Sequence, residues 1–563
     1  MLIFIIFIMH SHGLYDIAIL NGIVIDGCGN PWFKANIAIK DGIISAISKH
    51  EVFKADRIID ANGLIVSPGF IDIHSHSDVT LLVDPLAESK VMQGVTLEVV
   101  GNCGSSAAPV MGDFAINRML RRLSEYNLNL TWSSVDEYLS IMEGNGVSIN
   151  VAMLVGHGQI RSCVMDFEAR SPSLSELEEM KAILKESLED GAFGMSSGLV
   201  YAPGRFAKTE ELVELCKVVS EYNGLYATHI RGERETIIDA LNEAIYIAEK
   251  SGVRVQISHH PPKIGAFGKS IETLRIIEEA RKRGLDVACD FHPYIAGSTS
   301  LSALLPAWAQ EGGLNKIISR LRDPDLRTKI KEDMILEPIP GPGPCGLIKR
   351  GLWNMIYLSE CNRNRDLIGM NFEEIAKLRG VDPFEAYFDI LLEENLSGSI
   401  MGFYYDENDI RNVALSPFSM VGSDGYALSP RGVLFKEAAH PRSYGTFPMV
   451  IRKYVKGESR SELNYDCGSK IMSLETAIMK MTSIPASRLS IFDRGLIREG
   501  FWADIVIFNY DLISDTATYF NPQSFPKGIE YVIVNGVIVV DKGVHTGLKP
   551  GKVLRHKPLF MKY

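Results

Sequence analysis

The sequence predicts an α/β fold: a (β/α)8 TIM-like barrel, with a small β-sandwich built from both chain ends and an insertion between barrel strands 7 and 8. Eight apolar, strand-like runs follow one another, and amphipathic helical patterns lie between several of them. Short strands with tight turns precede this alternation and return after it. The chain of 563 residues is too long for one compact core and suits a large barrel with smaller modules.

Two segments precede the expected barrel. Residues 1–13 form an apolar extension that is too short for a bilayer span of roughly 20 residues, and it lacks a basic start and a clear cleavage site. Residues 14–66 show short strands joined by tight turns, with Asn21-Gly22 and Asp41-Gly42 as hairpin signals. We interpret 14–66 as the first part of the β-sandwich.

The barrel is expected over residues 67–484. The eight strand candidates are 70–76, 95–103, 149–157, 192–197, 224–230, 254–260, 286–294 and 416–424. Helical periodicity covers 174–188, where apolar residues recur near i, i+3 and i+7, and also about 208–222, 235–250 and 270–284. This alternation is typical of a barrel whose C-terminal strand ends form one functional face.

Residues 302–415 interrupt the alternation of strands and helices. They contain Pro338-Ile-Pro-Gly-Pro-Gly-Pro344 and several helical runs, which indicates an insertion between the seventh and eighth strands. The strand pattern returns in 503–508 and 531–540. Residues 485–563 are therefore expected to form the second part of the β-sandwich and a C-terminal tail.

The composition indicates an ordinary globular protein, with 46% hydrophobic and 23% charged residues. The net charge of −11 offers no electrostatic reason to expect nucleic acid or an anionic membrane as a partner. Eight scattered cysteines without a CxxC pair favour a reducing, cytoplasmic location. The short apolar N-terminus keeps an export or membrane role as the alternative.

Six potential metal ligands stand at the predicted C-terminal ends of barrel strands. They are His74, His76, Cys103, His229, His259 and Asp424. His74 and His76 are two residues apart, and residues i and i+2 of a strand point to the same face, so both imidazoles can address one ion. Imidazole and thiolate are good zinc ligands, and the cluster favours hydrolysis by a metal-bound hydroxide.

Each of these residues also has an ordinary structural explanation. A lone histidine at a strand end is usually hydrogen-bonded, a free buried cysteine packs as a small hydrophobe, and Asp-Gly commonly makes a turn. Their repetition at successive strand ends favours the metal site. His260 is an alternative to His259, because Pro261-Pro262 can distort the strand end. His10-Ser-His12 precedes every barrel strand and is not expected to bind metal.

Four longer motifs carry a more specific signal. They are Pro68-Gly-Phe-Ile-Asp-Ile-His-Ser-His76, Gly101-Asn-Cys-Gly104, Gly422-Ser-Asp-Gly425 and His440-Pro-Arg-Ser-Tyr-Gly-Thr-Phe447. Together they resemble the N-acyl-D-amino-acid deacylases (D-aminoacylases) of the amidohydrolase superfamily, over about residues 14–545. His-x-His alone marks only the superfamily, whereas Gly-Asn-Cys-Gly with His-Pro-Arg is much more specific.

The resemblance implies how the ligands divide between two metal positions. Cys103, His229 and His259 look like the ligands of one tightly held zinc, and His74, His76 and Asp424 look like a weaker second position. Related hydantoinases and dihydroorotases bridge two metals with a carboxylated lysine on the fourth strand. The corresponding stretch, Ala192-Phe-Gly-Met-Ser-Ser-Gly198, contains no lysine. Cys103 fills that gap and favours the deacylase branch.

The resemblance also implies how the carboxylate of an N-acyl amino acid is held. Arg442 matches the family's carboxylate-binding arginine, whose guanidinium can grip a carboxylate through two hydrogen bonds. Tyr294 and Ser300 match its supporting hydroxyls, and Ser298 is an alternative to Ser300.

The sixth-strand loop departs from the family pattern. The family usually has a lysine two residues after the sixth-strand ligand, where this chain has Pro261. Either Lys263 reaches into the site over a longer loop, or the contact is lost. His157, in Gly-His-Gly, is a further candidate for the pocket wall, and His440 is expected to be structural.

The combined prediction is a zinc-dependent enzyme that hydrolyses the amide bond of N-acyl-D-amino acids, releasing a carboxylate and a free D-amino acid. Asp424 is expected to take the proton of the attacking water and to pass it to the leaving amine. One alternative is another amidohydrolase activity, on a cyclic amide such as a hydantoin or on a β-aspartyl dipeptide. A non-catalytic scaffold of the same fold is the other.

Overall fold

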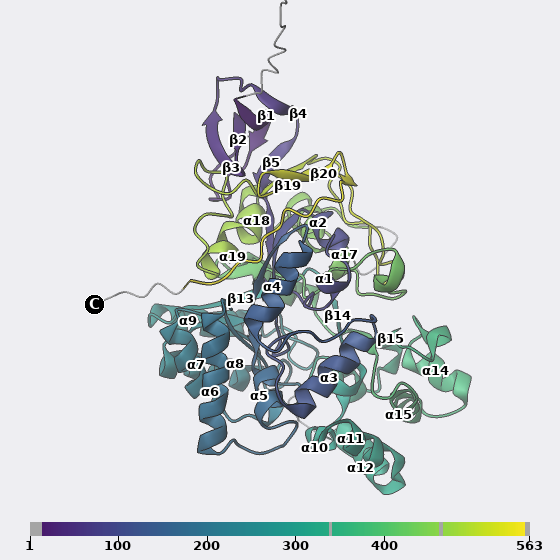
Figure 1. Ribbon diagram of the computed structural model, residues 1–563. Helices are drawn as coiled ribbons and strands as arrows, with labels where there is room; N and C mark the ends of the chain where they lie inside the picture. The colour runs from purple at the N-terminus through teal and green to yellow at the C-terminus, as the bar shows by residue number, and fades with distance from the viewer. Residues whose placement is uncertain (1–13, 337–340, 461–465, 558–563) are drawn as a thin grey trace, which may run out of the picture.

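The computed structural model describes residues 14–336, 341–460 and 466–557. Figure 1 shows a sheet made from both chain ends above the barrel, and the helices of a segment from the middle of the chain (about 307–393, teal to green) beside and below it. None of the described helices has both the length and the apolar character that crossing a membrane requires. The whole predicted extension 1–13, including His10-Ser-His12, lies outside the described residues.

Parallel strands close the predicted barrel. They are β6 (Phe70–Asp72), β7 (Val95–Val100), β8 (Asn150–Met153) with its continuation β9 (Val155–Gly156), β10 (Gly194–Gly198), β11 (Leu225–His229), β12 (Arg254–Ile257), β13 (Val287–Phe291) and β17 (Ser419–Val421). The pairing order is β6-β7-β8 and β9-β10-β11-β12-β13-β17. A parallel bridge between Ser75 and Gly425 joins the last strand to the first. The predicted barrel is confirmed.

Apolar side chains pack on both faces of the barrel strands. Inside, Ile71, Leu97 and Met420 belong to a buried cluster that Leu489 and Ile491 join from a later part of the chain. The helices outside or beside the barrel are α1 (Thr80–Val83), α2 (Glu88–Val91), α3 (Gly112–Ser124), α4 (Val135–Asn145), α5 (His157–Val164), α6 (Leu174–Glu189), α7 (Thr209–Glu221), α8 (Ile237–Ser251), α9 (Ser270–Lys282), α16 (Glu407–Leu415), α17 (Arg442–Val450), α18 (Leu474–Met481) and α19 (Ser483–Arg488).

The four helices predicted by periodicity are confirmed as α6, α7, α8 and α9, each within two residues of its expected bounds. Local chemistry fixes the start of α6. Ser173 accepts a hydrogen bond from the Glu176 amide while the Glu176 carboxylate accepts one from the Ser173 amide, which is a capping box.

Strands from both chain ends share one nine-stranded sheet. They are β1 (Tyr15–Val24), β2 (Phe33–Lys40), β3 (Ile43–Ser48), β4 (Ala55–Asp60) and β5 (Ile65–Pro68) from the N-terminal part, and β18 (Ile505–Phe508), β19 (Ile529–Val534), β20 (Val537–Asp541) and β21 (Val544–His545) from the C-terminal part. β5 pairs with both β1 and β18, so it joins the two parts. Ile19, Ile37, Ile505 and Ile533 lie in one buried cluster, so both parts also share a core.

The chain between β13 and β17 adds a small antiparallel sheet and several helices. They are β14 (Ala296–Ser300), α10 (Ala307–Gln310), α11 (Gly313–Arg322), α12 (Pro324–Leu336), α13 (Cys345–Ile348), β15 (Ile356–Glu360), α14 (Phe372–Arg379), α15 (Pro383–Glu393) and β16 (Ser399–Phe403). The sheet has the order β14-β16-β15. The following helix, α16, contacts α9, β13 and β17, which is the position of a barrel helix.

The strand predictions were too long at their C-terminal ends. β6 ends at Asp72, β7 at Val100, β12 at Ile257 and β17 at Val421, so most candidate ligands follow the strands instead of ending them. Beyond three of these ends the backbone turns left-handed, with φ of +51° at Cys103, +33° at His259 and +54° at Asp424. These residues lie outside the extended conformation of a regular strand.

Candidate active site

The six predicted ligands converge at the C-terminal ends of the barrel strands. One group contains His74, His76, Cys103 and Asp424, and another contains Cys103, His229 and His259. Within each group, one potential ligand atom per residue lies within 4.8 Å of all the others. Cys103 belongs to both groups, so its sulfur lies between the two possible metal positions.

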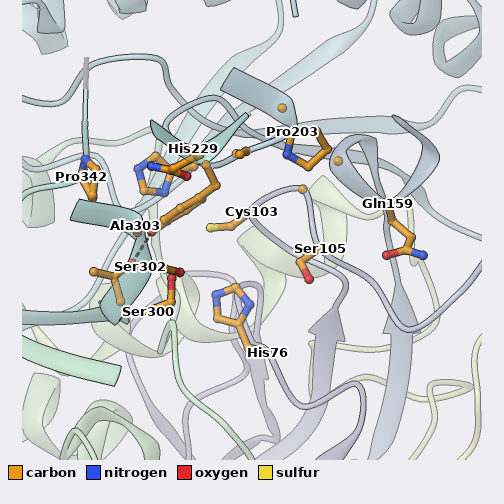
Figure 2. A pocket seen from close by; sticks show the side chains of 18 of the residues that line it. His76, Cys103, Ser105, Gln159, Pro203, His229, Ser300, Ser302, Ala303 and Pro342 are labelled. Carbon is orange, nitrogen blue, oxygen red and sulfur yellow. Dashed lines mark hydrogen bonds between the residues drawn. The ribbon is translucent and has the colours of Figure 1, made fainter. Parts of the chain in front are cut away.

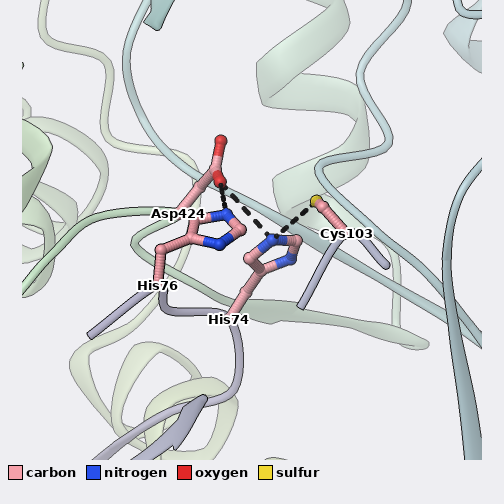
Figure 3. A group of neighbouring side chains, drawn as sticks. All are labelled: His74, His76, Cys103 and Asp424. Carbon is pink, nitrogen blue, oxygen red and sulfur yellow. Dashed lines mark hydrogen bonds and ion pairs between the residues drawn. The ribbon is translucent and has the colours of Figure 1, made fainter. Parts of the chain in front are cut away.

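Figure 3 shows the first group, with Asp424 above the two imidazoles and Cys103 beside His74. Asp424 Oδ1 lies 2.9 Å from His76 Nε2 and 3.4 Å from His74 Nε2. Cys103 Sγ lies 3.4 Å from His74 Nε2 and 3.6 Å from His259 Nε2. The His74 carbonyl accepts a hydrogen bond of 2.8 Å from the Asp424 amide, which fixes the two strand ends against each other.

An unpartnered ring nitrogen indicates that this cluster fits a metal ion. Both ring nitrogens of His229 are buried; Nε2 lies 3.2 Å from Glu233, whereas Nδ1 has no hydrogen-bond partner among the described residues. Buried polar atoms without partners are costly and rare in folded proteins. Burial by itself would raise the pKa of Cys103, but the neighbouring His74, His229 and His259 rings hold it well below its usual value. A thiolate among imidazoles is a donor set suited to zinc.

The strained backbone at the ligands is a second sign of function. Left-handed φ values at non-glycine residues cost about 1–3 kcal/mol each and cluster at active sites. Three of the six candidate ligands, Cys103, His259 and Asp424, adopt such values. The strain re-aims each side chain after its strand has ended.

Two buried carboxylates touch the imidazoles and were not singled out from the sequence. Glu233 lies 3.2 Å from His229 Nε2 and 3.1 Å from His259 Nδ1. Asp290 lies 3.3 Å from His74 Nδ1, and its other contacts include the His259 amide at 2.7 Å. Carboxylates behind metal-binding histidines orient the rings and raise their basicity. The available signal was an acidic residue inside an apolar strand, at Asp290, and an i+4 partner of His229, at Glu233.

A buried network supports the ends of three strands below the ligands. Lys90 Nζ lies 2.7 Å from Asp72 Oδ2, 3.5 Å from Glu98 Oε2 and 2.8 Å from Ser423 Oγ. Asp72 in turn accepts hydrogen bonds from the amides of His74 and Ser423. The network therefore ties the residues beside His74 and Asp424 into one unit.

The ligands open into a cavity of about 640 Å³. Figure 2 shows His76, Cys103 and His229 around it, with Ser300 and Ser302 also in its wall. Of the predicted substrate residues, Arg442, Ser300 and Lys263 line the cavity, as does the alternative Ser298.

His157 and Tyr294, which were predicted to contact the substrate, do not line the cavity. His157 is fully buried, and its Nε2 lies 2.8 Å from Glu211 Oε1. Tyr294 is buried with its hydroxyl 3.4 Å from the Pro441 carbonyl. Neither residue is among those that line the cavity. Residues at strand ends can point behind the wall as easily as into it.

The histidines left open by the sequence also have distinct surroundings. His260 Nε2 lies 3.0 Å from Thr273 Oγ1, and burial together with Lys263 lowers its pKa to about 3. Among the described residues, the ligand groups contain His259 and not His260. His440 lies 3.0 Å from the Ala296 carbonyl and accepts a hydrogen bond from the Arg442 amide, as expected of a structural residue.

Both predicted substrate cations are already in ion pairs. Arg442 Nη1 lies 2.6 Å from Asp424 Oδ2. Lys263 Nζ lies 3.0 Å from Glu233 Oε1 and donates to the His259 carbonyl at 2.7 Å. Lys263 does reach the cavity over its longer loop, as one of the two sequence-based alternatives proposed.

A barrel with imidazole, thiolate and carboxylate groups at its C-terminal face defines a class of metal-dependent hydrolases. The family model described as "Amidohydrolase family" matches residues 57–332 and 449–540. The chain therefore belongs to the amidohydrolase family.

Full-length relatives narrow this class and confirm the resemblance to D-aminoacylases. The chain is 33% identical to a D-aminoacylase of Alcaligenes xylosoxydans xylosoxydans, over 96% of this chain and 97% of the relative. It is 34% identical to an N-acyl-D-glutamate deacylase of the same organism, over 96% of each chain. The structure of a Bordetella bronchiseptica N-acyl-D-glutamate deacylase, complexed with zinc and a phosphonate mimic of the tetrahedral intermediate, aligns with a TM-score of 0.79 and 30% identity, over 96% of this chain and 99% of that one.

Proposed function

We propose that this protein is a zinc-dependent deacylase that hydrolyses N-acyl-D-amino acids to a carboxylate and a free D-amino acid. The observation that carries the proposal is the pair of ligand groups sharing Cys103 at the floor of a cavity that also contains Arg442. The full-length relatives named for D-amino-acid substrates support the D enantiomer and zinc.

We assign Cys103, His229 and His259 to a tight zinc position, and His74, His76 and Asp424 to a weaker one. When bound, zinc supplies Lewis acidity and lowers the pKa of a water to about 7. Asp424 Oδ1 faces the imidazoles, where it can accept a proton from the attacking water and later deliver it to the leaving nitrogen. Burial would raise the pKa of Asp424, but Arg442 and His76 hold it well below its usual value, so the carboxylate is ionised.

Arg442 is proposed to receive the substrate α-carboxylate while it orients Asp424. Its Nη1 holds Asp424 Oδ2, and its Nη2 has only a weak contact of 3.4 Å with the Ser298 carbonyl among the hydrogen bonds of the described residues. Ser300 and Lys263 are proposed to assist from the same wall. Tyr294 is proposed to support this wall from behind, next to Pro441, whereas His157, paired with Glu211, is assigned no contact with the substrate.

The remaining parts of the chain are proposed to support the barrel. The nine-stranded sheet is interpreted as a β-sandwich made from 14–66 and 485–563, and 302–415 as an insertion that walls the cavity. The partner is a small N-acyl amino acid, and the net charge of −11 gives no electrostatic reason for a nucleic-acid or anionic-membrane partner. The eight free, scattered cysteines support a cytoplasmic location.

The test is a panel of paired substrates with zinc-loaded protein. We expect turnover of N-acetyl-D-amino acids, much slower turnover of their L enantiomers, and loss of activity after chelation that zinc restores. Metal analysis should find about one tightly held zinc per chain. Hydrolysis of a hydantoin or a β-aspartyl dipeptide in preference to every N-acyl-D-amino acid would contradict the proposal.

A further inference from the structure

One face of α3 forms the outer wall of the active-site cavity. The α3 side chains in the lining are Phe114, Asn117, Arg118, Arg121 and Arg122. Residues spaced three, four, seven and eight apart on a helix lie on one face. Three arginines of α3 therefore line the same cavity as His76, Cys103 and Asp424.

The wall beside α3 is apolar and comes from the segment between β13 and β17. Leu314 and Ile317 of α11 line it, together with Leu396. The Gly312 amide donates to the Phe167 carbonyl at 3.2 Å, which brings the start of α11 to the same place. The Arg118 guanidinium lies 5.6 Å from the centre of the Phe167 ring. The outer end of the cavity thus combines guanidinium groups with aromatic and aliphatic surface.

Basic side chains outnumber carboxylates in the lining of the cavity. Lys263 and Arg442 are paired with Glu233 and Asp424. The third lining carboxylate, Asp78, accepts from the Ala107 amide at 3.3 Å. None of the three α3 arginines forms a salt bridge with a carboxylate among the residues that the structure describes.

The contacts that the α3 arginines do make are to neutral oxygens. Arg118 donates to Ser162 Oγ at 3.3 Å, and Arg121 donates to the Asn395 carbonyl and to Ser397 Oγ. Arg122 also borders a neighbouring cavity with Glu125 and Glu360. Glu360 is paired with Lys436 there. The arginines are held in place but keep donors available to an anionic ligand.

We infer that Arg118, Arg121 and Arg122 form an anion-binding subsite at the outer end of the cavity, so that the preferred substrate carries a second anionic group besides its α-carboxylate. A guanidinium matches the geometry of a carboxylate and is more weakly hydrated than an ammonium, which suits a partly apolar wall. The second carboxylate belongs either to the amino-acid side chain or to the acyl chain. The inference rests on the proposed function and specifies its substrate class.

The test compares acids with their neutral amides in two substrate pairs. N-acetyl-D-glutamate and N-acetyl-D-glutamine probe the side chain, and N-succinyl-D-leucine and N-succinamoyl-D-leucine probe the acyl chain. In the double variant Arg118→Gln/Arg122→Gln, the acid-to-amide ratio of kcat/KM should fall at least about tenfold for one pair, as expected when charge-assisted hydrogen bonds are lost. The pair that responds identifies the source of the carboxylate.

The matched control is Arg322→Gln, which removes an exposed arginine from α11 that does not line the cavity. Its ratios should equal those of the wild type. Unchanged ratios for both pairs in the double variant would overturn the inference. Arg122→Gln alone replaces the double variant if thermal unfolding shows that the latter does not fold.

Calorimetric binding separates failure of the inference from failure of the proposed function. If zinc-loaded wild type hydrolyses none of the four compounds, the deacylase function fails. Binding of the same acids and amides then decides the inference: it stands if an acid binds at least about tenfold tighter than its amide and the double variant loses the difference. It falls if acids and amides bind alike.

Discussion

Asp424 presents its two carboxylate oxygens to different partners. Oδ1 faces His76 and His74, whereas Oδ2 is held by Arg442 at 2.6 Å. Asp424→Asn keeps the shape of the side chain but cannot accept a proton. We expect kcat to fall about 10²–10⁴-fold, while the tight zinc assigned to Cys103, His229 and His259 is retained. Steady-state kinetics with metal analysis checks both, and the exposed Asp366→Asn is the control. Near-normal kcat would remove Asp424 from proton transfer.

Glu233 is predicted to strengthen zinc binding. It is the carboxylate next to both His229 and His259, and Lys263 balances its charge. Glu233→Gln removes the negative charge that orients the two rings, so zinc should bind about 10–100-fold more weakly. Competition with a chelator measures this without any assay of turnover. Glu235→Gln, two residues along the chain and partly exposed, should bind zinc like the wild type; equal losses in both variants would contradict the role of Glu233.

At the scale of elements, α2 holds three strand ends in position through Lys90. Its ammonium contacts Asp72 at the end of β6, Glu98 in β7 and Ser423 after β17, all buried. Lys90→Met leaves two buried carboxylates without their cation, and losing one partner of a buried ion pair typically costs about 3–5 kcal/mol. Denaturant unfolding should show this loss.

The control for Lys90→Met is Lys185→Met on the exposed face of α6. Lys185 lies 4.0 Å from Glu189, and both side chains are more than half exposed. Exposed pairs contribute about 0–1 kcal/mol. Similar stability changes in both variants would show that the Lys90 network does not hold the strand ends.

For the whole molecule, zinc is expected to act as a stabilising crosslink between elements far apart in sequence. The ligand groups join the ends of β6, β7, β11, β12 and β17. A ligand that binds only the folded state adds about 4 kcal/mol at a thousandfold excess over its Kd. Chelation should therefore lower Tm measured by scanning calorimetry. Cys103→Ala should lose this response and the exposed Cys28→Ala should keep it; a zinc-independent Tm in the wild type would contradict the expectation.

The barrel could be predicted because its signal is local. Runs such as Val95–Val100 and the 3.6-residue periodicity of 174–188 determine strand and helix over a few residues, and their alternation determines the barrel. The identity of the candidate ligands was local too, since histidine, cysteine and aspartate at strand ends can be recognised by residue type. The resemblance to D-aminoacylases followed from contiguous motifs and is confirmed by the full-length relatives.

Only the tertiary structure decided which side chains meet and what each one faces. Local periodicity does not report φ, so it could not predict the left-handed residues Cys103, His259 and Asp424 that follow three of the strands. Glu233 beside two imidazoles, Arg442 on Asp424, and the α3 arginines in the cavity wall depend on contacts across loops. His157 faces Glu211 for the same reason. Sequence patterns determine the elements and their chemistry, whereas the direction of a side chain after a strand end depends on how distant segments pack.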